Sequence, residues 1–112
     1  MKFKITILAL AITTTAIIYS CDTRTYDEIG CVAVAHPTYA KDIKPIMDNY
    51  CVSCHNANGP SPDLTTYDGV KNDAEAVYNA IYDGSMPQGG NKLNNNTIQT
   101  FQNWINDGTP QN

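Results

Sequence analysis

Positive charge is scarce in this chain. Seven Lys and Arg residues stand against eleven Asp and Glu among 112 residues, a formal net charge of −4 at pH 7. Residues 1–20 carry Lys2 and Lys4 and no acidic residue, so without them the net charge is two lower, at −6. This balance argues against nucleic acid as a partner and favours a protein partner with a basic surface. The length allows one small domain, and no internal repeat or low-complexity segment divides it.

The chain also lacks a long uninterrupted apolar run. The apolar stretch from Ile5 to Ile18 is short and broken by threonines, so it does not predict a membrane span. With Lys2 and Lys4 before it, residues 1–20 instead have the pattern of an export signal. The end of this segment, Ile-Tyr-Ser-Cys, resembles a bacterial lipoprotein signal in which Cys21 becomes the lipidated first residue of the mature protein. The alternative is ordinary cleavage, with Cys21 an incidental thiol; on either interpretation the mature chain lies in the periplasm or cell envelope, and lipid would anchor it to a membrane.

Residues 21–38 show no sustained periodicity, and we interpret them as a tether to a domain over residues 39–112. Within the tether, a short apolar stretch beginning at Cys31 could lie against the domain or form a brief strand. Cys31 itself is interpreted as a small inert thiol. The alternatives are intermolecular pairing or a disulfide with an unlipidated Cys21.

The most informative stretch is residues 51–55, Cys-Val-Ser-Cys-His. A Cys-x-x-Cys-His run is typical of c-type haem attachment. The thiols of Cys51 and Cys54 lie about one helical turn apart, so both can add to the vinyl groups on one side of a porphyrin. His55 then supplies an axial imidazole to the iron. A structural zinc site would need further ligands at suitable spacing, and a thioredoxin motif would need a βαβ pattern; the sequence has neither.

Helical periodicity dominates the sequence from Tyr39 onward. A first helix is predicted to run from Tyr39 into Cys54, with Pro45 in its first turn and an apolar face of Ile43, Ile46, Met47 and Tyr50. A turn or short helix is predicted around Leu64, Tyr67 and Val70.

Two further helices are predicted after this turn. Residues 73–83 form one, with Asp73 as N-cap and Gly84 at its end. Residues 96–107 form the other, with Gly108 as the stop signal. The fold class expected from these patterns is all-α.

A second iron ligand is predicted at Met86, in the loop 85–90 between two helices. A thioether there can face the open side of the iron, and such ligation raises the reduction potential. The alternative is that Met86 packs on the core, as methionine often does. Met47 lies at core spacing and is interpreted as core, whereas His36 is expected to be exposed and is a minor alternative for the distal ligand. The aromatic rings of Tyr67, Tyr78 and Trp104 are expected to pack in the core; the alternative is contact with the haem or a propionate.

The haem motif, Met86-Pro87 and a closing helix with Trp104-Ile105-Asn106-Asp107-Gly108 together resemble the small monohaem class I cytochrome c domains, over residues 39–112. The resemblance is to those found on bacterial lipoproteins and as modules of larger exported proteins. The resemblance implies three to five short helices wrapped around one covalent haem c, with the first and last helices crossing near a haem edge. It implies thioethers at Cys51 and Cys54, proximal ligation by His55 and distal ligation by Met86. The short stretch from His55 to Met86 implies a trimmed domain with an exposed haem edge.

We therefore expect an electron-transfer cytochrome and not an enzyme. The iron would cycle between ferrous and ferric states with both axial positions occupied, so no small-molecule substrate is expected. The expected partners are redox proteins of a respiratory or extracytoplasmic chain, with the lipid anchor holding the domain beside them. The alternative is a haem-based gas or redox sensor, and a peroxidase is a third hypothesis that the lack of a second haem motif and of a distal acid-base histidine disfavours.

Overall fold

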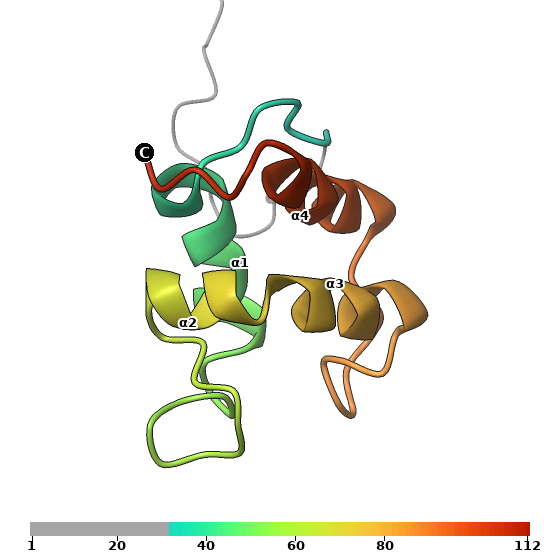
Figure 1. Cartoon of the computed structure of the whole chain (residues 1–112). Coiled ribbons are helices and arrows are strands. Elements are labelled where there is room, and N and C mark those ends of the chain that lie inside the picture. Colours follow the sequence, from blue (N-terminus) through green and yellow to red (C-terminus); the bar gives the residue numbers. More distant parts are fainter. Residues whose placement is uncertain (1–31) are drawn as a thin grey trace, which may run out of the picture.

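The computed structural model describes residues 32–112, and every regular element within this range is helical. The elements are a π-helical turn, η2 (Tyr39–Ile43), and the helices α1 (Lys44–Tyr50), α2 (Tyr67–Asn72), α3 (Ala74–Asp83) and α4 (Asn95–Asn106) (Figure 1). The all-α prediction is confirmed for this part of the chain. None of these described helices is long and apolar enough to cross a bilayer. The predicted signal segment, with Cys21, and the thiol of Cys31 lie outside the described residues.

The first helix starts at Tyr39 as predicted, but its first turn is π-helical. The amide of Ile43 donates to the carbonyl of Thr38 at 3.3 Å, five residues back. Pro45 follows as the second residue of α1, directly after the π-helical turn. The helix ends at Tyr50, earlier than predicted, so residues 51–55 leave α1 as turns and do not extend it.

The helices α2 and α3 follow one another with only Asp73 between them. The short helix α2 is capped by Thr66, whose hydroxyl oxygen accepts from the amide of Gly69 at 3.1 Å. The helix α3 matches the predicted bounds, although the Asp73 side chain makes no capping hydrogen bond. Gly84 ends it in the left-handed conformation with φ of 83°, as expected of a C-cap glycine.

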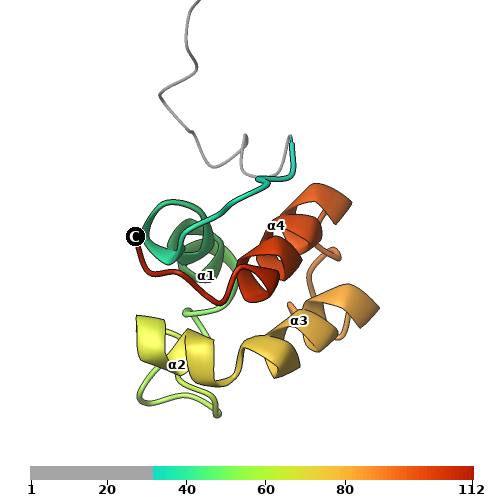
Figure 2. The ribbon, with the colours of Figure 1, turned by 45° about the horizontal axis from the view of Figure 1, so that its top comes forward.

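The last helix, α4, packs against both α3 and η2 (Figure 2). It begins one residue earlier than predicted because Asn94 provides the N-cap, its side-chain oxygen accepting from the amide of Thr97 at 2.8 Å. The chain turns away at Gly108, whose φ is 84°. This packing brings the first and last elements of the domain together.

Aromatic rings fill the space between α4, α2 and η2. Trp104 is completely buried and lies 5.5 Å from Phe101, 6.1 Å from Tyr39 and 6.5 Å from Tyr67, measured between ring centroids. The indole N–H of Trp104 donates to the carbonyl of Pro110 at 2.9 Å, which fastens the C-terminal segment over the cluster. The predicted core role of Trp104 is confirmed.

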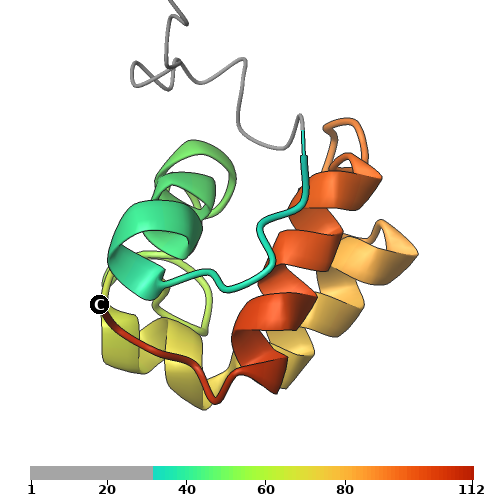
Figure 3. The same cartoon turned by 90° about the horizontal axis from the view of Figure 1, so that it is seen from above.

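Part of the segment predicted as a tether lies along α4 (Figure 3). The amide of Val34 donates to the Thr100 hydroxyl at 2.9 Å, and its carbonyl accepts from the Asn103 side chain at 2.8 Å. Pro37 is fully buried. Of the two options for this apolar stretch, the structure shows the chain lying against the domain at Val34, while Val32 is exposed, and no strand forms among residues 32–38.

Candidate functional site

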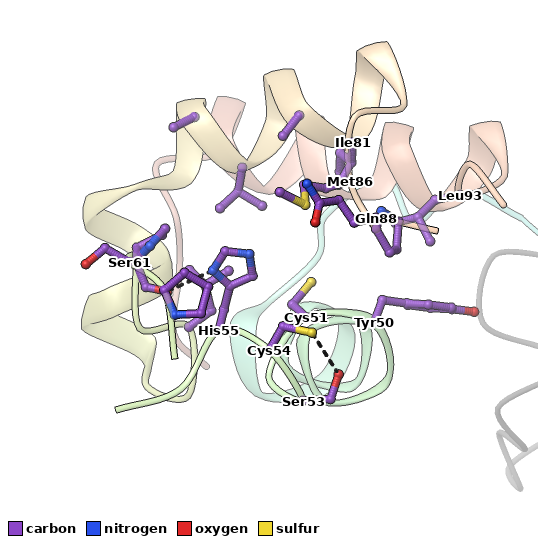
Figure 4. A pocket seen from close by; sticks show the side chains of 17 residues that line it. Tyr50, Cys51, Ser53, Cys54, His55, Ser61, Ile81, Met86, Gln88 and Leu93 are labelled. Atoms are coloured by element: carbon purple, nitrogen blue, oxygen red, sulfur yellow. Dashed lines mark hydrogen bonds between the residues drawn. The ribbon is translucent and has the colours of Figure 1, made fainter. Parts of the chain in front are cut away.

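An apolar cavity of about 480 Å³ lies between the Cys-x-x-Cys-His run and α3. Figure 4 shows seventeen side chains around it, from the segment 50–64 on one wall and from α3 and the residues up to Leu93 on the other. His55 is the sole His, Lys, Arg, Asp or Glu among them. The volume is in the range typical of sites for small molecules and cofactors. A lining without Lys, Arg, Asp or Glu suits a largely apolar ligand.

The Cys-x-x-Cys-His run forms one tight turn at the edge of this cavity. The amide of His55 donates to the carbonyl of Cys51 at 2.8 Å, which closes a helix-like turn. The side chains of Cys51 and Cys54 both line the cavity, and their sulfur atoms lie on the same side of it (Figure 4). The structure thus brings both predicted attachment residues to one edge of one cavity.

The two thiols differ in their environment. Cys54 is exposed, whereas Cys51 is half-buried, and burial raises the pKa of the Cys51 thiol to about 11. The reactive cysteine of a thioredoxin-type pair has a lowered pKa, because the thiolate is the nucleophile. Cys51 is therefore unlike the attacking thiol of a dithiol oxidoreductase.

The imidazole of His55 extends into the cavity, and a backbone carbonyl accepts a hydrogen bond from its ring. Its Nδ1 lies 3.1 Å from the carbonyl oxygen of Pro62. A carbonyl can only accept, so Nδ1 donates this hydrogen bond, and in the neutral imidazole Nε2 has the lone pair that can bind a metal. The backbone carbonyl of His55 in turn accepts from the amide of Leu64 at 3.0 Å.

Met86 reaches the same cavity from the opposite wall. Its thioether faces the space between α3 and the His55 ring (Figure 4). The loop that carries it is fastened to α3, because the amide of Met86 donates to the carbonyl of Ala80 at 3.1 Å. The neighbouring amide of Ser85 donates to Asp83 at 2.8 Å. Both predicted axial ligands thus border the cavity that the two cysteines line.

The alternative distal ligands lie elsewhere. Met47 is fully buried in the core, as predicted, and does not border the cavity. The side chain of His36 is 87% exposed, and its Nδ1 lies 3.0 Å from a carboxylate oxygen of Asp107 on the α4 side of the domain. Neither side chain therefore reaches the space in front of His55.

Several cavity residues were not anticipated from the sequence. Ala76 and Ala80 lie one helical turn apart on α3 and provide a shallow surface beside Val77 and Ile81. Their spacing of four residues was a usable signal for a helix face that a flat ligand can approach. The role of the Pro62 carbonyl had no such signal, because a backbone acceptor can belong to any residue type.

Within residues 32–112, no three His, Cys, Asp or Glu side chains converge to hold a metal ion. Comparison with protein-family models gave no match, and comparisons with curated proteins and with solved structures gave none either.

Proposed function

We propose that this protein is an electron-transfer monohaem c-type cytochrome with the cytochrome c fold. The observation that carries the proposal is the shared cavity of the Cys-x-x-Cys-His turn and Met86. A turn with two thiols and an imidazole lines one wall, and a thioether faces it from the other. Histidine and methionine are the axial pair of cytochromes c, and the cysteines are the residues that carry haem c.

The side chains of the cavity fit this cofactor. The lining is predominantly apolar, as a porphyrin requires, and the candidate iron ligands are a nitrogen and a sulfur from separate chain segments. When bound, the haem iron would take up and release one electron. The carbonyl of Pro62 accepts a hydrogen bond from the imidazole of His55, residues of α3 line the opposite wall of the cavity, and His55 and Met86 would hold the iron. With both residues bound to the iron, no site would remain for a substrate at the metal.

The proposal includes the cell envelope as the site of action. Cys21 would carry lipid, and the residues after it would hold the domain close to membrane redox proteins and raise its effective concentration there. The described residues contain four Lys and eight Asp or Glu, so a partner with a basic surface would be attracted. The proposed partners are redox proteins of a respiratory or extracytoplasmic chain.

Absorption spectra of the matured protein in both oxidation states, with and without carbon monoxide, test this function. The proposal predicts a low-spin spectrum with the weak methionine-to-iron band in the ferric form and no response of the ferrous form to carbon monoxide. A high-spin spectrum or ready carbon monoxide binding would contradict it and favour the sensor hypothesis. Peroxide turnover with a reduced donor would instead favour the peroxidase.

A further inference from the structure

A three-residue segment, Pro62 to Leu64, makes two contacts with His55. The carbonyl of Pro62 accepts from the imidazole Nδ1 at 3.1 Å. The amide of Leu64 donates to the main-chain carbonyl of His55 at 3.0 Å. Asp63 stands between these two contacts, so a shift of its peptide group would disturb both.

The opposite side of this segment rests on α2. A Cβ built on Gly69 would lie 2.1 Å from the carbonyl oxygen of Asp63, a distance that no side chain can occupy. The nearest atom belongs to the backbone, so it cannot move aside as a flexible side chain would. Gly69 is therefore the residue that lets α2 approach the segment behind His55.

Local hydrogen bonds restrict movement at the contact between Gly69 and the Asp63 carbonyl. The carboxylate of Asp63 accepts from the hydroxyl of Thr65 at 2.7 Å and from its amide at 3.0 Å, and these bonds hold the pKa of the Asp63 carboxyl below its usual value. Thr66 then caps the amide of Gly69 at 3.1 Å. These hydrogen bonds link neighbouring residues between Asp63 and Gly69. They therefore limit how far the Asp63 carbonyl can move away from Gly69.

We infer that Gly69 is a positioning residue for the iron ligand His55, acting through the Asp63 peptide and the Pro62 carbonyl. The inference rests on the proposed function, in which His55 binds the haem iron. A hydrogen bond from Nδ1 to a carbonyl makes the imidazole a stronger electron donor, which favours the ferric state. The close approach of α2 therefore helps to set the reduction potential of the iron.

The test compares the matured protein with Gly69→Ala and with a control, Gly90→Ala. At Gly90 a Cβ would meet its nearest neighbour, Pro87, at 3.7 Å, which is ordinary contact. We expect Gly69→Ala to raise the reduction potential and to speed solvent exchange of the His55 Nδ1 proton, measured by NMR, by about tenfold. The Gly90→Ala protein is expected to match the wild type in both measurements.

A purely structural role for Gly69 would lower stability and leave the potential and the proton exchange of the folded protein unchanged, and that result would overturn the inference. If Gly69→Ala does not yield folded protein, Thr66→Val loosens the same contact by removing the cap on the Gly69 amide. It is expected to shift the potential in the same direction by a smaller amount, and no shift would overturn the inference. Absence of covalent haem in the wild type would instead defeat the proposed function.

Discussion

The Met86→Leu variant is expected to keep covalent haem and to lose the low-spin spectrum of the wild type. Leucine preserves the apolar volume of methionine but has no sulfur to bind iron. The ferric methionine band should disappear, the ferrous form should bind carbon monoxide, and the reduction potential should fall, because thioether ligation favours the ferrous state. Absorption spectra and a redox titration measure these changes.

The matched control is Met47→Leu, the same substitution in the core. Met47 is fully buried and does not line the cavity, so its spectra should equal those of the wild type. Its free energy of unfolding should fall by less than about 1.5 kcal/mol. Identical spectra for Met86→Leu and the wild type would show that Met86 is not an iron ligand.

The Trp104→Ala variant is expected to lose about 3–5 kcal/mol of unfolding free energy. Its ring is fully buried among Phe101, Tyr39 and Tyr67, and its N–H holds the carbonyl of Pro110. Truncation leaves a cavity and frees the C-terminal segment. Because small domains have only about 5–15 kcal/mol in total, the urea midpoint should drop sharply.

Tyr82→Ala provides the control for this second prediction. Tyr82 is an aromatic residue of α3 that is 60% exposed, so its removal should cost less than about 1 kcal/mol. Equal losses for Trp104→Ala and Tyr82→Ala would contradict the view that the aromatic cluster holds α4 to η2 and α2.

Local chemistry explains which elements could be predicted from the sequence. Gly84 ends α3 because a helix C-terminus favours the left-handed conformation, and this signal is contained in a few neighbouring residues. The end of α1 at Tyr50 was missed because the apolar spacing continues to Cys54, whereas the backbone there follows the turn that closes on Cys51. The π-helical turn η2 was missed because apolar periodicity alone does not separate it from an α-helical turn.

In the candidate site, too, some features could be predicted from the sequence and others could not. Cys51, Cys54 and His55 could be proposed because their chemistry requires that spacing. The interactions that position His55 could not be predicted, because they depend on the Pro62 carbonyl and on contact between α2 and Asp63. Such contacts arise from the path of the loop and leave no residue-type signature apart from a glycine. Met86 was predictable as a candidate, but its position across the cavity from His55 depends on how α3 and its following loop fold.

The measurement that tests the central claim most directly is the mass of the protein matured in cells that attach haem c. The account predicts one haem per chain, retained under denaturing conditions and found on the peptide that contains Cys51 and Cys54. Exchange of either cysteine for alanine should remove one of the two thioether bonds. A chain that is matured and exported under these conditions with both thiols unmodified would contradict the account.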